Sequence, residues 1–113
     1  MTQPYTRDEL EHIVCQTAQM IAPAPPDSVK LSDRLVGDLG FHSLAMVELA
    51  YALEDVFSLE EIGSGIVTSI ERIGDIVPLV SVALENGRAK MPSSHALAEL
   101  AEDYGFVWKA KVS

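Results

Sequence analysis

Residues 37–57 read GDLGFHSLAMVELAYALEDVF. The glycines at its start, Gly37 and Gly40, permit a tight turn, and the residues after them contain neither glycine nor proline. The segment therefore predicts a turn followed by a helix over residues 44–57, with Ser43 as a favourable N-cap residue. A hydroxyl at such a helix start is exposed. A phosphate linked to it would lie among free N–H groups at the positive end of the helix dipole.

The predicted helix carries two apolar lines, which is more than a small helical core requires. One interpretation is a deeply buried helix, and the other is a core face with a second, exposed contact face. Glu48 and Asp55 flank the second line, so the contact face would have an acidic rim. The first line comprises Met46, Leu49, Ala50, Leu53 and Phe57, and the second comprises Leu44, Val47 and Tyr51.

The chain is strongly acidic. Eight Lys and Arg residues against seventeen Asp and Glu residues give a net charge of −9. This excess repels phosphate backbones and anionic lipids, so it argues against binding to nucleic acid or membranes and favours partners with basic faces. No Lys or Arg occurs between Arg34 and Arg72. Such a tract is most often a solvated face, but its place directly after Ser43 favours a recognition surface.

The remaining patterns predict one all-α domain in a chain of 113 residues. A capping box at Thr6 and Glu9 opens a helix over residues 6–21, which prolines end. A long connection over residues 23–42 holds several residues that look buried. A short third helix is predicted between Glu60 and Glu71, and a fourth from Ile73 to the Asn86-Gly87 stop. The residues in the connection that look buried are Val29, Leu31, Leu35, Val36 and Leu39.

Residues 88–113 differ from the rest, so the predicted organisation is a domain over residues 1–87 and a C-terminal extension. The extension begins with a linker, and a short amphipathic segment follows Ser94. This segment could dock on the bundle, fold against a partner, or stay mobile.

Catalytic and metal-binding constellations are missing from the sequence. His12, His42 and His95 are far apart and show no ligand spacing, so no metal site is predicted. Cys15 lies beside the apolar face of the first helix, which favours a packed, inert thiol. A single cysteine and the lack of a signal peptide or a membrane span lead us to expect a cytoplasmic protein.

The stretch Asp38-Leu39-Gly40-Phe41-His42-Ser43-Leu44, with Val47-Glu48-Leu49 and Ala52-Leu53-Glu54-Asp55-Val56-Phe57, resembles an acyl carrier protein. The resemblance covers roughly residues 5–86. It implies a four-helix bundle with three main helices and a short third one. It also implies that Ser43 carries 4′-phosphopantetheine, derived from coenzyme A, whose thiol holds acyl groups as thioesters. By the same resemblance, partner enzymes would be recognised through Asp38, His42, Leu44, Val47, Glu48, Tyr51 and Asp55.

Two departures from the family's pattern refine this expectation. His42 stands where the family usually has Asp, which resembles peptidyl carrier domains, and the C-terminal extension is longer than in the minimal carriers. We therefore expect a discrete, monomeric, non-catalytic carrier in polyketide or related specialised metabolism. Its expected partners are a phosphopantetheinyl transferase and acyl-transferring, ketosynthase or adenylating enzymes with basic docking faces.

Three alternatives remain open from the sequence. A peptidyl carrier for a nonribosomal peptide synthetase would use the same serine. An unmodified helical adaptor would bind a partner helix through its two-faced second helix. An enzyme acting through His42 and Ser43 is disfavoured, because no orienting partner or oxyanion element is evident.

Overall fold

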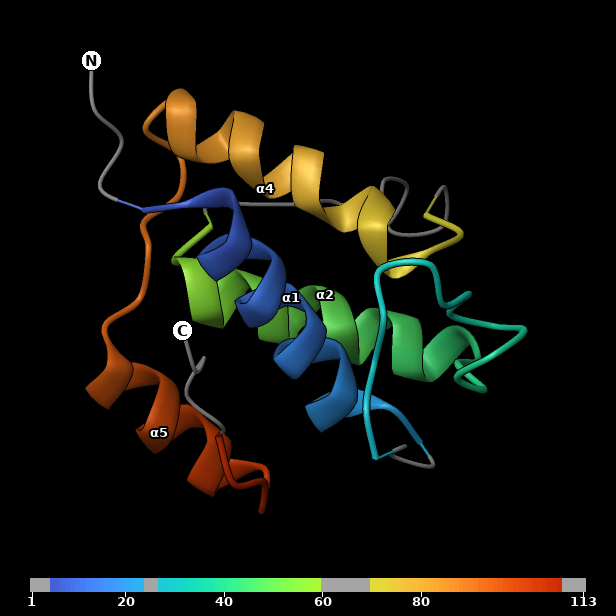
Figure 1. The fold of residues 1–113 in the computed structure, drawn as a ribbon. Helices are drawn as coiled ribbons and strands as arrows, with labels where there is room; N and C mark the ends of the chain where they lie inside the picture. The colour runs from blue at the N-terminus through green and yellow to red at the C-terminus, as the bar shows by residue number, and fades with distance from the viewer. Residues whose placement is uncertain (1–4, 24–26, 60–69, 109–113) are drawn as a thin grey trace.

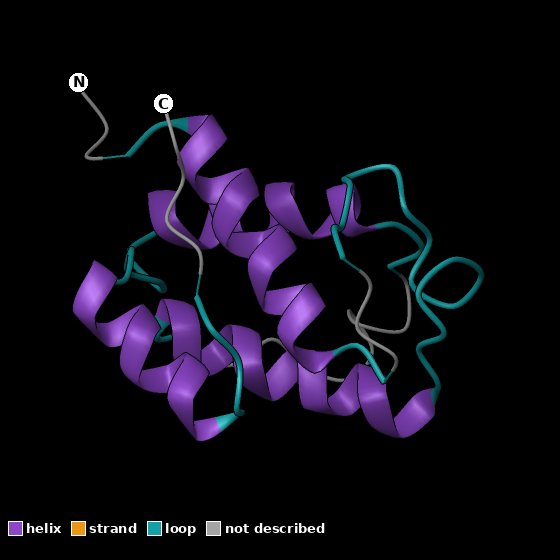
Figure 2. Cartoon of the chain, turned by 60° about the horizontal axis from the view of Figure 1, so that its bottom comes forward, coloured by secondary structure: helices purple, strands orange, loops and turns teal. Residues whose placement is uncertain are grey.

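The computed structural model describes residues 5–23, 27–59 and 70–108. Within these ranges the chain forms α-helices and one short 3₁₀ turn, and no strand (Figures 1 and 2). This confirms the predicted all-α class. The elements are α1 (Arg7–Ile21), α2 (Ser43–Phe57), the 3₁₀ turn η1 (Ile73–Asp75), α4 (Ile76–Glu85) and α5 (Ser94–Asp103).

Helix α1 begins and ends where the sequence indicates. The Thr6 hydroxyl accepts the N–H of Glu9 at 3.1 Å, which satisfies one of the free donors of the first turn. The helix ends at Ile21, two residues before Pro23, whose ring is incompatible with a continuing helix. The prediction of a helix over residues 6–21 is therefore confirmed, with Thr6 as its cap.

The core lies where α1, α2, η1 and α4 meet, and α4 packs over the α1–α2 pair (Figure 1). Each helix contributes the apolar line that its sequence spacing defines. The same core also takes in the connection between α1 and α2, through Leu35. The largest fully buried side chains are Leu10, Val14, Thr17, Leu35, Leu49, Leu53, Phe57, Ile73, Ile76, Val77 and Val80.

The long connection between α1 and α2 is fixed to the segment that precedes α4. The N–H of Leu35 donates to the carbonyl of Glu71 at 2.9 Å, and the N–H of Gly74 donates to the carbonyl of Leu31 at 2.8 Å. Leu35 and Leu39 are buried, as predicted, but the expectation for Val36 is wrong, because its side chain is 68% exposed. An irregular loop has no periodic face, so apolar character alone did not identify its buried positions.

Helix α4 follows a 3₁₀ turn held by Asp75. Its carboxylate accepts the backbone N–H groups of Arg72 and Glu71 at 2.9 and 3.1 Å, and these two hydrogen bonds, that of Arg72 first, lower the pKa of Asp75. Pro78 lies in the first turn of the helix, where its missing N–H is tolerated. The helix stops before Gly87, which has φ +75°, as the Asn86-Gly87 signal predicted. The predicted third helix falls almost entirely on residues 60–69, outside the described residues.

Helix α5 packs against α2 on the side of the α1–α2 pair that lies away from α4 (Figure 1). The hydroxyl of Ser93 accepts the N–H of Ala96 at 3.1 Å and caps the helix, while Leu97 and Ala101 are buried. Just before α5, the N–H of Lys90 donates to the carbonyl of Phe57 at 2.7 Å. In the ranges that the structure covers, no helix has the length and apolar character needed to cross a membrane.

Candidate functional site

Ser43 is the first residue of α2, and its side chain is exposed. The prediction that Ser43 caps this helix is wrong. The N-cap is His42, whose backbone is extended (φ −118°, ψ 179°) and whose Nδ1 accepts the N–H of Ala45 at 3.3 Å. The serine preference at N-caps favoured Ser43, but an imidazole nitrogen has a lone pair that can perform the same task.

The cap on His42 leaves the Ser43 hydroxyl free. Within the described residues, no hydrogen bond holds that hydroxyl, so capping and chemical attachment do not compete for its oxygen. The carbonyl of His42 also accepts the N–H of Met46 at 2.9 Å. The N–H groups of Ser43 and Leu44 have no acceptor within the helix, because the first turn of any helix lacks one. These two N–H groups can therefore donate hydrogen bonds to an anion attached at this end of the helix.

The turn before Ser43 is anchored on both sides. The N–H of Phe41 donates to the carbonyl of Leu35 at 2.9 Å, and the side chains of Leu39 and Phe41 are buried. Between them, Gly40 has φ +72°, and among the described residues a Cβ at Gly40 would meet no atom within 4 Å apart from its chain neighbours. Glycine is therefore required here by backbone conformation, and the surface beside Ser43 is open to an approaching enzyme.

We expect Gly40→Ala to lower the free energy of unfolding by about 1–2 kcal/mol, because a Cβ strains the left-handed backbone. Gly37→Ala is the matched control. Gly37 has no left-handed backbone, and its added Cβ would meet the movable side chain of Arg34 at 3.3 Å. We expect a change within about 0.5 kcal/mol for this control in urea unfolding. Equal losses in the two variants would contradict the strain argument.

Asp38 holds the same turn together. Its carboxylate accepts the backbone N–H of Arg34 at 2.7 Å and lies 3.7 Å from Nε of that residue. These contacts give Asp38 a structural task in placing the turn. Its predicted part in partner recognition stays a prediction.

The two apolar lines of α2 separate as the second interpretation proposed. Leu44 and Tyr51 are 64% and 62% exposed, and Val47 is exposed as well. Glu48 and Asp55 lie exposed beside them and form no ion pair within the described residues. The other line turns inward, where Ala50 is half-buried and Met46, Leu49, Leu53 and Phe57 are buried.

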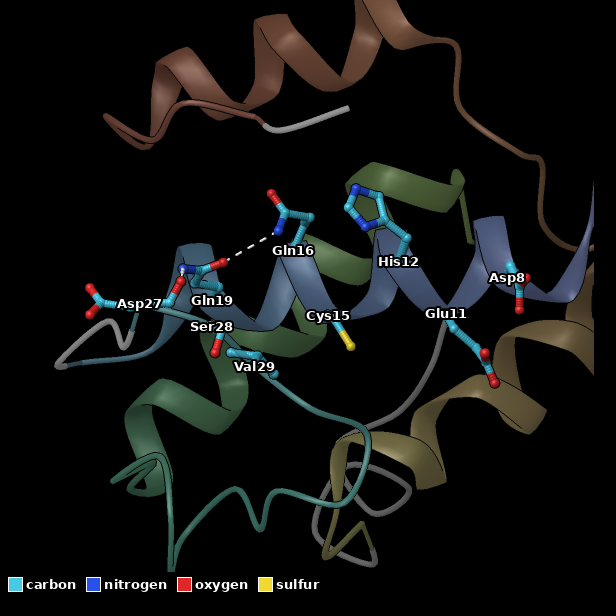
Figure 3. Close-up of a pocket in the computed structure, with 9 residues that line it drawn as sticks. All are labelled: Asp8, Glu11, His12, Cys15, Gln16, Gln19, Asp27, Ser28 and Val29. Carbon is cyan, nitrogen blue, oxygen red and sulfur yellow. Dashed lines mark hydrogen bonds between the residues drawn. The ribbon is translucent and has the colours of Figure 1, made fainter. Parts of the chain in front are cut away.

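A shallow cleft of about 580 Å³ runs along α1 (Figure 3), and Ser43 is not among the residues that line it. Cys15 lines it together with Glu11 and His12 from the same helix and with Asp27 and Val29 from the connection. Within the described residues, no group of three or more His, Cys, Asp and Glu side chains could hold a metal ion. Burial raises the pKa of the Cys15 thiol to about 11, with smaller contributions from Glu11 and Asp33.

We expect Cys15 to react slowly with iodoacetamide at neutral pH. Its pKa of about 11, against an ordinary 9.0, reduces the reactive thiolate about a hundredfold. Because the raised pKa favours the neutral thiol, the labelling rate should climb as the pH approaches 11. Labelling followed by intact mass, with glutathione as the reference thiol, measures this rate. Labelling as fast as that of glutathione would contradict it.

Residues 9–77, most of the chain, match the family model described as "Phosphopantetheine attachment site". The chain belongs to this family. The matched residues include Ser43, the turn before it and the whole of α2.

Curated relatives point the same way. The chain is 38% identical over 53 residues to an acyl carrier protein of Campylobacter fetus, covering 47% of this chain and 64% of that protein. It is 27% identical over 90 residues to acyl carrier protein 3 of Ralstonia nicotianae, covering 80% of this chain and 98% of that protein. The chain thus spans just under two thirds of the first relative and nearly all of the second. The resemblance to acyl carrier proteins is confirmed at the level of the family.

Membership establishes the class of function. Proteins of this family carry covalently attached 4′-phosphopantetheine and are carriers rather than catalysts. The predictions of this cofactor and of a non-catalytic, phosphopantetheine-bearing carrier are therefore confirmed. The family also implies interaction with a phosphopantetheinyl transferase and with acyl-handling enzymes.

Proposed function

We propose that Ser43 is the attachment residue and that the chain tethers acyl intermediates as thioesters and delivers them to successive enzymes. One observation carries this proposal. Ser43 places an exposed hydroxyl, held by no hydrogen bond within the described residues, at the start of α2, because His42 takes over the cap. In the part of the chain that the structure describes, the turn leading to Ser43 is also open on its outer side.

The residues around Ser43 fit a phosphodiester. When bound, 4′-phosphopantetheine supplies a thiol at the end of a long flexible arm. The Ser43 oxygen would hold its phosphate, and the N–H groups of Ser43 and Leu44 would face that negative charge. The positive end of the α2 dipole contributes about 0.3–1 kcal/mol at such an exposed position. The remaining tasks of this chain are to hold the arm rigidly at its base and to present α2 to partners.

The setting that we propose is polyketide or related specialised metabolism, with the chain acting as a discrete, monomeric carrier in the cytoplasm. Two features support it: His42 in place of the usual Asp, and the extension beyond residue 87. The proposed partners are acyl-transferring, ketosynthase or adenylating enzymes. Their docking faces would be basic, because the exposed line of α2 is flanked by Glu48 and Asp55.

The test of the proposed function is intact mass after incubation of the purified chain with a broad-specificity phosphopantetheinyl transferase and coenzyme A. We expect a gain of one phosphopantetheinyl group, and peptide fragmentation should place it on Ser43. A chain that stays unmodified, or that is modified at another residue, would overturn the assignment.

The second candidate is a peptidyl carrier, which His42 favours. The two candidates share the attachment chemistry and differ in the enzyme that loads the thiol. Loading of the holo-protein by an adenylating enzyme with an aminoacyl group would support the peptidyl carrier. Loading by an acyltransferase would support the polyketide setting.

We expect Glu48→Lys to slow acyl transfer to a partner enzyme by about three- to tenfold at low salt, because it reverses a rim charge on the docking face. Glu48 is exposed, so the melting temperature should move by no more than about 2 °C. Raising the salt should narrow the difference, since screening weakens exposed charges. Transfer kinetics with the loaded holo-protein measure this effect.

Glu85→Lys is the matched control for that variant. Glu85 is exposed at the end of α4, and its substitution changes the net charge by the same amount without touching α2. We expect transfer from this variant to stay within about twofold of wild type. Equal slowing by both substitutions would indicate a response to net charge and would count against a docking role for α2.

A further inference from the structure

A groove lies between α5, at the lower left of Figure 1, and the C-terminal half of α2. Its volume is about 230 Å³. Leu97 and Val56 form part of its floor and are 6% and 4% exposed. We call it the α2–α5 groove. It is lined by Asp55 and Val56 of α2, by Ala96, Leu97, Glu99, Leu100 and Asp103 of α5, and by Pro92.

Carboxylates stand on both lips of the groove. Asp55 lies on the α2 side, and Glu99 and Asp103 lie on the α5 side. The Oε1 atom of Glu99 lies 2.8 Å from Nε2 of His95, one helical turn earlier. The groove therefore combines an apolar floor with acidic lips, on which Asp55 and Asp103 have no cationic partner among the described residues.

Tyr104 is an exposed aromatic residue next to this groove. It follows α5 directly and is 42% exposed. Partial burial raises the pKa of its hydroxyl, and Asp55, Glu48 and Asp103 raise that pKa further. Tyr104 directly follows Asp103, which lines the groove, so this exposed residue lies at the α5 end of the groove.

We propose that the α2–α5 groove and Tyr104 form a second half of the docking surface, and that the groove receives an arginine or lysine side chain from a basic helical face of the partner enzyme. This proposal rests on the carrier function proposed above and names the partner chemistry that α5 adds. The bundle over residues 1–87 would supply the attachment serine. The extension would widen the surface that partners recognise.

The dimensions and chemistry of the groove select this occupant. Small-molecule sites typically enclose about 300–1,000 Å³, so the groove is better matched to a single side chain. An arginine or lysine can lay its aliphatic stem along the apolar floor while its charged head reaches the carboxylates on the lips. A second copy of this chain is a poor occupant, because its net charge of −9 opposes close approach.

The experiment uses the full-length apo-protein, labelled with ¹⁵N, and a probe peptide. The probe is an amphipathic helix of about four turns with one leucine line and arginines spaced one turn apart. We expect its addition to shift the amide resonances of Asp55 and Val56 together with those of Glu99, Leu100 and Asp103. Shifts confined to α2, or no binding at millimolar peptide, would overturn the proposal.

Charge reversals then test the groove itself. Asp103→Lys should weaken peptide binding about fivefold at low salt. The substitution replaces a lip carboxylate with a positive charge, which repels the arginines of the probe. Glu102→Lys is the matched control, since Glu102 is the neighbouring exposed residue of α5 and does not line the groove. It should change the dissociation constant by less than about twofold. Equal effects of the two substitutions would overturn the proposal.

Two further variants test whether the peptide binds at the groove and its edge rather than elsewhere on the protein. Tyr104→Ala should weaken peptide binding about threefold, since it removes an exposed ring from the edge of the surface. Glu85→Lys should bind the peptide within about twofold of wild type, because Glu85 lies at the exposed end of α4 and does not line the groove. A chain that accepts phosphopantetheine but shows no α5 response would refute the docking inference and leave the carrier function intact.

Discussion

Ser43→Ala is expected to abolish the mass gain that wild type shows with a phosphopantetheinyl transferase and coenzyme A. The loss should be complete, because the substitution removes the only atom of residue 43 that can form the phosphodiester. The fold should be retained. Ser43 is exposed, its hydroxyl has no hydrogen bond within the described residues, and His42 caps the helix, so stability should change by no more than about 0.5 kcal/mol.

Ser94→Ala is the matched control for this loss. Ser94 is likewise an exposed serine at the first position of a helix, α5, and it too follows a residue whose side chain caps that helix. The two serines thus share their local geometry and differ in the turn and acidic face around them. Ser94→Ala should gain the full mass. A modified Ser43→Ala protein, detected by the same intact-mass measurement, would refute the attachment assignment.

The sequence predicted the helices well wherever a local signal sets their ends. Thr6 and Pro23 bound α1, and Gly87 stops the chain after α4, because capping hydrogen bonds, a missing N–H and a left-handed backbone are all properties of a few adjacent residues. The start of α2 was placed one residue late for the same reason. Histidine is uncommon as a cap, so the rule chose Ser43 where the structure uses His42.

Features that depend on distant segments could not be predicted in this way. Whether Leu44 and Tyr51 face solvent depends on which sides of α2 the other helices cover, and two apolar lines on one helix leave that choice open. The same is true of α5. The spacing of Leu97 and Ala101 indicates an amphipathic helix, but only the contact with α2 reveals that its apolar side closes a groove beside Asp55.

The last expected result concerns the division of the chain at residue 87, which stays a prediction. We expect a chain truncated after Gly87 to unfold cooperatively, because every one of the largest fully buried side chains precedes residue 88. Loss of α5 uncovers Val56 and removes the burial of Leu97. The free energy of unfolding should fall by about 2 kcal/mol, and the melting temperature by on the order of 10 °C.

Two substitutions in the full chain show whether α5 docks as a separate unit. Leu97→Ala removes a buried side chain from α5, and Val107→Ala, at a residue that is 80% exposed, is the control. If α5 is an independent unit, Leu97→Ala can cost no more than the truncation does, since α5 can simply detach. Thermal unfolding followed by circular dichroism compares the three proteins. A larger loss for Leu97→Ala than for the truncation, or a truncated chain without a cooperative transition, would place α5 within the same core and refute the division at residue 87.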